Sequence, residues 1–229
     1  MRLDKFLSNM GVGTRTEVKQ LLKKNSVKVN DKVEKSPKSQ VDPEQDEITV
    51  DGKMIEYINY IYIMLNKPKG YVSATYDDIN QTVIDLIADY RHLDIFPVGR
   101  LDKDTEGLLL ITNDGQFNHN LMSPSKHVSK TYKVTSKYPI KNEDIIAFKN
   151  GIELSDGKVK PAQLEKLDHK LSLVTIYEGK YHQVKRMFHS IDNEVLELKR
   201  LKISNLTLDE NLKSGEYRLL TSEEFKLLQ

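Results

Sequence analysis

The sequence contains no cysteine, and no apolar run in it is long enough to cross a membrane. The absence of cysteine excludes disulfide bonds and cysteine-ligated zinc. Six histidines are present, but they follow none of the spacings typical of a metal site. The first residues lack the apolar core and the small-residue cleavage site of a secretory signal. We therefore expect a cytoplasmic protein without a metal site.

The composition is that of a folded chain. Hydrophobic residues make up 38% of the 229 residues and charged residues 30%, which allows a buried core beneath a charged surface. A chain of this length is long enough for two unequal domains.

The net charge of +1 conceals a strong segregation of charge along the chain. Residues 1–40 hold ten basic side chains and four acidic ones, a net charge of +6. Residues 41–56 hold six acidic side chains and a single lysine. We therefore place a domain boundary near residue 56, with domains at 1–56 and 57–229.

The first 56 residues show the pattern of two short helices beside a small sheet. Apolar residues recur at helical spacing on both sides of a glycine-containing break at residues 11–14, and Thr14 with Glu17 forms a capping-box pattern. Two short segments at 27–29 and 48–50 alternate as strands do. Composition leaves open whether the lysines of this region bind a partner or form an ordinary solvated helix face.

The most informative segment of the remainder is GRLDKDTEGLLLITNDG at residues 99–115. Its pattern predicts a loop, a buried strand and a turn. By pattern, Asp102 and Asp104 are more often turn residues that bond to their own backbone, and a metal-binding carboxylate pair is a weaker possibility.

As a whole, this segment resembles the signature of the bacterial RsuA family of pseudouridine synthases, which modify ribosomal RNA. Three further segments resemble that family's motifs, and they occur in the family's order: KPKG at 67–70, KTYKV at 130–134 and EGKYHQVKRMF at 178–188. The N-terminal pattern, RLDKFL at 2–7 with VKVN at 27–30, is similar to the alpha-L RNA-binding module named after the fourth small-subunit ribosomal protein. The resemblance spans essentially the whole chain and is far more specific than one short motif.

The resemblance implies an α+β fold, with a small alpha-L RNA-binding domain before a catalytic domain whose mixed sheet is largely antiparallel. It implies that Asp102 is the catalytic nucleophile, that Tyr132 packs on the substrate base, and that Lys185 pairs with Asp102. Many relatives have arginine at the position of Lys185, and a lysine cannot form a bidentate pair with a carboxylate. Without the resemblance, Tyr132 could equally be a half-buried strand tyrosine.

The implied partner is ribosomal RNA, and no cofactor is implied. The segments YHQVKR at 181–186 and GEYRLLT at 215–221 resemble the branch that modifies 16S ribosomal RNA, although Leu219 stands where proline is familiar. We expect a monomer that acts on 16S ribosomal RNA or on a small-subunit assembly particle. The residues expected to contact RNA are Arg2, Lys5, Arg15, Lys19, Lys23, Lys67, Arg100 and Arg186.

Three other interpretations remain open at this point. A large-subunit pseudouridine synthase would use the same chemistry on 23S ribosomal RNA. A non-catalytic RNA-binding or ribosome-assembly protein would need only the basic N-terminal region, but it would leave the Asp102 segment unexplained. A metal-dependent hydrolase would be built on Asp102, Asp104 and Asp114, and the sparse histidines argue mildly against it.

Overall fold

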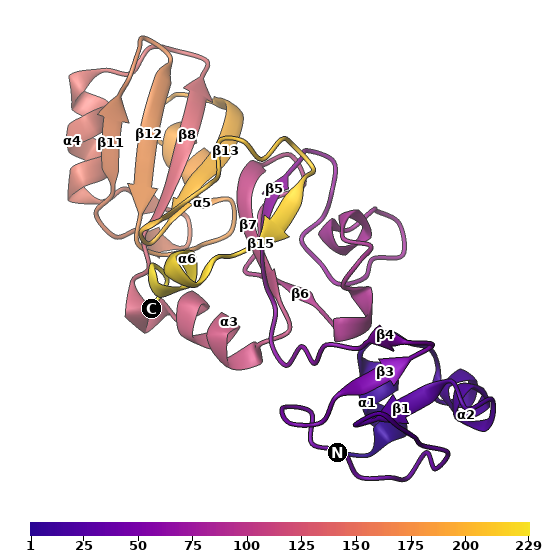
Figure 1. Cartoon of the computed structure of the whole chain (residues 1–229). Coiled ribbons are helices and arrows are strands. Elements are labelled where there is room, and N and C mark those ends of the chain that lie inside the picture. The colour runs from indigo at the N-terminus through magenta and orange to yellow at the C-terminus, as the bar shows by residue number, and fades with distance from the viewer. The chain divides into compact units, whose positions relative to one another are not determined.

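The computed structural model describes residues 1–229 and divides into two compact units (Figure 1). The first unit contains Met1–Ile61 together with Asp89–Ile95, and the second contains Tyr62–Ala88 and Phe96–Gln229. No helix of either unit is of the length and apolarity that a bilayer crossing requires.

The N-terminal unit has the predicted two helices and small sheet. Helix α1 spans Leu3–Asn9 and α2 spans Arg15–Lys23. The sheet has the order β2-β1-β3-β4, with bounds Lys32–Val33, Val27–Val29, Ile48–Val50 and Lys53–Met54. The capping box at Thr14 is confirmed, since its hydroxyl accepts from Glu17 N and its amide donates to the Glu17 carboxylate at 2.7 Å.

The apolar side chains of this unit are buried in its core, and its basic side chains lie at the surface. The core consists of Leu3, Phe6, Leu7, Val18, Leu22, Val27, Val41, Ile48 and Val50. The side chains of Lys5, Arg15, Lys19 and Lys23 are all exposed. Arg2 is half-exposed and donates two hydrogen bonds to the buried carboxylate of Asp4. The N-terminal unit therefore has a cationic surface over a well-packed core.

The second unit contains a nine-stranded sheet of the predicted mixed, largely antiparallel kind (Figure 1). Its order is β11-β12-β8-β13-β7-β5-β15, while β14 pairs with β13 and β6 with β7. Only β13 and β7 run parallel. The bounds are β5 Tyr62–Lys67, β6 Phe96–Val98, β7 Glu106–Thr112, β8 Lys130–Ser136, β11 Gln163–Lys166, β12 Leu171–Ile176, β13 Val195–Ile203, β14 Leu206–Thr207 and β15 Tyr217–Leu219.

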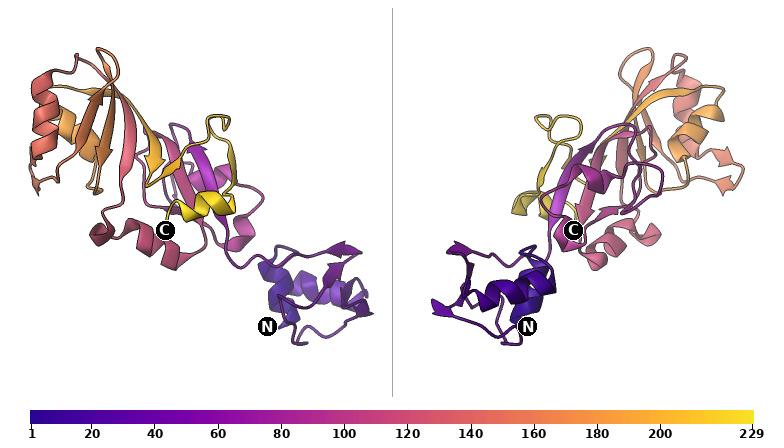
Figure 2. Two further views of the ribbon diagram at one scale, coloured as in Figure 1. Left: turned by 60° about the vertical axis from the view of Figure 1, so that its left-hand side comes forward. Right: turned by 90° about the vertical axis from the view of Figure 1, so that its right-hand side faces the viewer.

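Short helices pack against both ends of this sheet. Their bounds are α3 Gly115–Met122, α4 Asn142–Asn150, α5 Gln183–His189 and α6 Ser222–Lys226, with 3-10 turns at Val83–Leu86 and Pro124–Lys126. Helix α4 lies beside β11, whereas α6 lies beside β5 and β15 (Figure 2). Phe117 of α3 stacks on Phe225 of α6 at 5.4 Å between ring centroids, so the two helices share one core.

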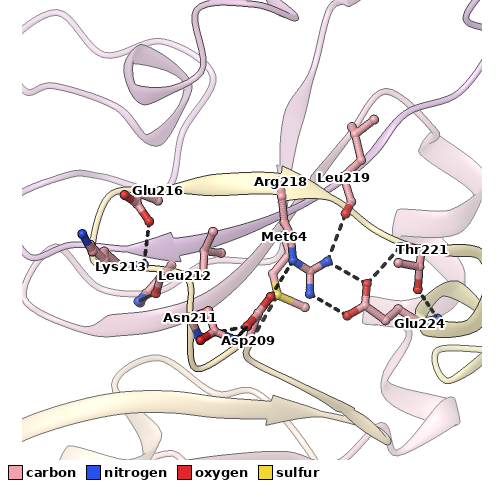
Figure 3. Close-up of polar contacts among 11 residues, drawn as sticks. Met64, Asp209, Asn211, Leu212, Lys213, Glu216, Arg218, Leu219, Thr221 and Glu224 are labelled. Carbon is pink, nitrogen blue, oxygen red and sulfur yellow. Dashed lines mark hydrogen bonds and ion pairs between the residues drawn. The ribbon is translucent and has the colours of Figure 1, made fainter.

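Arg218 ties the C-terminal segment to the sheet (Figure 3). It lies on edge strand β15 and bonds to Asp209 at 2.8 Å and to Glu224 at 2.7 Å. Glu224 also accepts from the backbone N–H of Thr221, whose hydroxyl caps α6. One guanidinium therefore fixes the loop before β15, the strand and the helix after it.

The parallel contact between β7 and β13 depends on a glycine. Gly107 pairs with Arg200 and has φ of +102°, and a Cβ atom there would lie 2.2 Å from the carbonyl oxygen of Arg200. Only a residue without a side chain lets the two backbones approach this closely. The position of β13 beside β7 therefore depends on Gly107.

We expect Gly107→Ala to lower the free energy of unfolding by roughly 1–3 kcal/mol more than a matched glycine substitution does, because β13 must move away. Gly157→Ala is the control, since Gly157 has a similar φ of +104° with nothing within 4 Å of its ideal Cβ. Chemical denaturation of both variants measures the difference. Equal losses would mean that backbone strain, and not the close approach, makes Gly107 necessary.

Candidate active site

The loop that contains Asp102 connects β6 to β7 and is held in place by side chains from a neighbouring segment. The hydroxyl of Ser73 accepts from the backbone N–H of Leu101 at 3.0 Å and donates to its carbonyl at 2.9 Å. Within the loop, the N–H of Thr105 donates to the carbonyl of Asp102 at 3.1 Å. The backbone at Asp102 is therefore fixed on both sides.

Lys67 stabilises the same loop through hydrogen bonds to its backbone carbonyls. Its side chain is fully buried at the end of β5, and its Nζ donates to the carbonyls of Asp102 at 3.0 Å, Thr105 at 2.8 Å, Pro68 at 3.1 Å and Lys103 at 3.4 Å. Burial lowers the pKa of Lys67 to about 8, so the ammonium is still largely charged at neutral pH. Lys67 was expected to contact RNA, and in this structure its ammonium is instead enclosed by protein and directed at backbone carbonyls.

The carboxylate of Asp102 has a cationic or hydrogen-bonding partner on each oxygen. Its Oδ2 lies 3.0 Å from Nζ of Lys185, and its Oδ1 lies 3.3 Å from Nε2 of His182. Lys185 is in the first turn of α5, and His182 is the residue before that helix. The structure brings together Asp102 and Lys185, which the sequence pointed to, and adds His182, which sequence reasoning missed.

Lys185 is shared between two carboxylates. Its Nζ lies 2.6 Å from Oδ1 of Asp104 as well as 3.0 Å from Asp102. Burial opposes the charge on this lysine, but hydrogen bonds to Asp104 and Asp102 outweigh burial and raise the pKa of Lys185. Burial likewise opposes the charge on Asp104, and the bond from Lys185 dominates and lowers the pKa of Asp104. Lys185 and Asp104 therefore both stay charged across the neutral range.

An aromatic pair lies next to this cluster. The ring of Tyr181 stacks on that of His182 at 3.8 Å between centroids, and the Tyr181 side chain is 77% exposed. His182 has φ of +46°, a left-handed conformation that is unfavourable for a residue with a side chain and that is typical of functional sites. Stacking and the contact with Asp102 keep His182 in that conformation.

These groups line a cavity of about 730 Å³, a size typical of ligand sites. Tyr132 reaches it from β8 with a side chain that is almost fully buried. Arg100 lines it from the Asp102 loop and is exposed. The cavity is therefore lined by the three residues expected to be catalytic, Asp102, Tyr132 and Lys185, and by Arg100, which was expected to contact RNA.

The remaining expected RNA contacts lie elsewhere. Arg2, Lys5, Arg15, Lys19 and Lys23 belong to the N-terminal unit. Arg186 is not among the residues that line the cavity; its guanidinium contacts the carboxylate of Asp156 and donates to the carbonyl of Tyr181 at 3.0 Å.

The three aspartates of the hydrolase interpretation do not converge. Asp114 caps α3 by accepting from the N–H groups of Gln116 and Phe117, and it also accepts from the hydroxyl of Tyr62 at 2.7 Å. No three His, Asp or Glu side chains of the structure gather as metal ligands would.

A second lysine of the cavity, Lys130, has no carboxylate partner. Its Nζ donates to the carbonyl of Val128 at 3.0 Å. Burial, with a smaller contribution from the charge of Arg200, lowers the pKa of Lys130 to about 8 from the ordinary 10.5. The folded chain therefore releases this proton at a lower pH than the unfolded chain does.

We expect Lys130→Met to be more stable than the wild type at about pH 7, with the advantage shrinking as the pH rises from about 8 to 10.5. In that window the unfolded state binds more protons at this site, so the wild type gains stability with pH and the variant lacks this gain. Denaturant midpoints at several pH values measure it. Lys133→Met is the control, because Lys133 is exposed on the same strand. A stability difference independent of pH would contradict the account.

Comparison with family models agrees with this geometry. Residues 61–190 match the model of the RNA pseudouridylate synthases, and residues 1–48 match the S4 domain. The first match spans more than half of the chain and contains the loop of Asp102, Tyr132 and Lys185.

Several relatives match over nearly their whole length. An uncharacterized RNA pseudouridine synthase of Bacillus subtilis, YtzG, is 49% identical, with 100% of this chain and 98% of that protein covered. Ribosomal small subunit pseudouridine synthase A of Vibrio cholerae is 45% identical, covering 98% and 97% of the two chains. The crystal structure of a pseudouridylate synthase is 40% identical, covers 100% of both chains and superposes with a TM-score of 0.72. This chain belongs to the RNA pseudouridine synthases, which are isomerases, and its N-terminal unit is an S4 domain.

Proposed function

We propose that this enzyme converts one uridine of 16S ribosomal RNA to pseudouridine, with Asp102 as the nucleophile. The observation that carries the proposal is the Asp102 carboxylate at the wall of a nucleotide-sized cavity, held by Lys185 and His182. Relatives that are 40–45% identical carry the name ribosomal small subunit pseudouridine synthase A, which supports the choice of RNA. The substrate is 16S RNA or a small-subunit assembly particle, and the enzyme acts as a monomer.

The S4 domain docks the enzyme on folded RNA. Its exposed cations Lys5, Arg15, Lys19 and Lys23 neutralise phosphates, which provides affinity with little choice of sequence. The catalytic unit then selects the uridine. Binding should accordingly weaken as the salt concentration rises.

The reaction requires no change in oxidation state. The bond from ribose C1′ to uracil N1 breaks, the base turns, and C1′ bonds to C5 of the same base. C5 loses a proton and N1 gains one, so the atoms balance without a cofactor. A carboxylate can attack either the ribose carbon or the base, and Asp102 is positioned to do so without a separate base to activate it.

The target uridine must leave its stack to reach Asp102, at a cost of a few kcal/mol. The exposed guanidinium of Arg100 at the cavity wall is placed to fill the space that the base leaves and to bind phosphate. Tyr132 packs on the extruded uracil, and its hydroxyl assists removal of the proton from C5.

We expect Asp102→Asn to bind RNA but to lose turnover by roughly 10³-fold or more, because the amide is not a nucleophile. Pseudouridine formation in unmodified 16S and 23S RNA, mapped by position, measures it. Asp104→Asn is the matched control, since Asp104 also pairs with Lys185, and it should lose less than about tenfold.

Three other outcomes of the mapping experiment would each contradict part of the proposal. Modification of 23S RNA instead of 16S RNA would change the branch and leave the reaction intact. An active Asp102→Asn enzyme would remove the nucleophile assignment. If the wild type modifies neither RNA, whether naked or in assembly particles, an RNA-binding protein becomes the better interpretation.

Tyr132→Phe separates the two roles of the tyrosine. The ring that packs on uracil remains and the hydroxyl is removed, so we expect single-turnover rates to fall by about 10²-fold or more while the Kd for RNA is unchanged. An undiminished rate would rule out the proton-transfer role and leave the packing role standing.

A further inference from the structure

Arg200 is a buried arginine on the sheet face that forms the floor of the cavity. It lies on β13 with an exposed fraction of only 2%, and it lines the same cavity as Asp102. Its register partner on β8 is Tyr132. Directly opposed residues of an antiparallel pair project from the same face, so the two side chains stand together on the floor.

The guanidinium of Arg200 is only partly satisfied. Nε donates to the carbonyl of Leu108 at 2.7 Å, but the buried Nη2 has no hydrogen-bond partner. A buried donor without a partner is rare and costly in a native protein. Arg200 also lines the cavity, so its guanidinium has hydrogen-bonding capacity that the protein itself does not use.

The protein supplies no anion to balance this charge. The other cation of the floor, the half-buried Lys130, bonds only to a backbone carbonyl. The carboxylates that line the cavity have other partners: Asp102 and Asp104 contact Lys185, and Glu178 accepts from Lys160 N and from the side chain of Gln183. A ligand that carries or develops negative charge would complete the site.

We propose that Arg200 donates a hydrogen bond to a carbonyl oxygen of the extruded uracil and stabilises the negative charge that the ring carries once its bond to ribose breaks. This inference rests on the proposed function. When the C1′–N1 bond breaks, its electron pair leaves with the base and spreads onto O2 and O4. The charge disappears again when C5 bonds to C1′ and the ring regains its neutral form.

The apolar lining of the cavity favours the uracil base over a phosphate as the partner of Arg200. Besides Arg200 and Tyr132, the cavity is lined by the apolar side chains of Leu101, Val128, Ile176, Val184 and Leu198. Such a surface suits a flat pyrimidine ring with two acceptor oxygens. Arg100 is exposed, and it is the better placed of the two arginines for a phosphate.

The first test compares Arg200→Met and Arg200→Lys on RNA that the wild type modifies. Removal of a donor to a developing oxyanion typically slows a reaction by about 10²–10³-fold, so we expect Arg200→Met to lower kcat by that factor while the Kd for RNA stays within about twofold. Arg200→Lys keeps the charge and should recover part of the rate. Lys199→Met, at the neighbouring position, should react like the wild type. Thermal unfolding confirms that each variant folds.

The second test distinguishes a contact with the base from a purely structural role. An RNA fragment that contains the mapped uridine is prepared with sulfur in place of O2 or of O4, because sulfur is the weaker acceptor. At the oxygen that Arg200 contacts, the sulfur should slow the wild type but should have little further effect on Arg200→Met. Such non-additivity is the signature of a direct interaction.

The outcomes separate this inference from the function on which it rests. If the sulfur slows both enzymes by the same factor at both positions, or if Arg200→Met keeps the wild-type kcat, the contact with uracil is excluded and the reaction assignment stands. If the wild type converts no uridine, the proposed function fails and the inference fails with it.

Discussion

The active site depends on the buried ammonium of Lys67, because this single group organises the loop that presents Asp102. It bonds to the carbonyls of Asp102, Lys103 and Thr105 and so fixes the turn that the loop makes between β6 and β7. A charge that is completely buried is tolerated only where acceptors surround it. The lysine therefore stabilises one backbone conformation, and that conformation directs the Asp102 side chain toward α5.

The charged side chains of the cavity form two groups, one around Asp102 and one that consists of Lys130 and Arg200. On one side, Lys185 and His182 from the start of α5 contact the carboxylate of Asp102 and fix its orientation. On the floor, Lys130 and Arg200 lack carboxylate partners. The first group pairs cations with carboxylates of the protein, whereas the second consists of cations without a carboxylate partner. Such preorganisation is more effective in a cavity shielded from water than at a surface.

The sheet places these two groups of charged side chains next to each other. Gly107 allows β13 to run parallel to β7 at a distance that no side chain would permit, and β13 in turn pairs with β8. Arg200 is thereby brought opposite Tyr132 and within reach of the carbonyl of Leu108. The loop of Asp102 leads into the same strand β7. A close backbone contact thus couples the floor of the cavity to the loop that contains Asp102.

Local patterns in the sequence were enough to predict many of the elements and the class of chemistry. Hydrophobic periodicity predicted the helices and strands of the N-terminal unit, and the resemblance of the segments around Asp102, Tyr132 and Lys185 to family motifs predicted the family, because such patterns depend on nearest neighbours. Three features could be seen only in the folded structure: the burial of Lys67 next to the Asp102 loop, the contact of His182 with Asp102, and the position of Arg200 opposite Tyr132. These relations join residues that are from 35 to 80 positions apart in the sequence. They arise from strand register and burial, which no local pattern of residue types encodes.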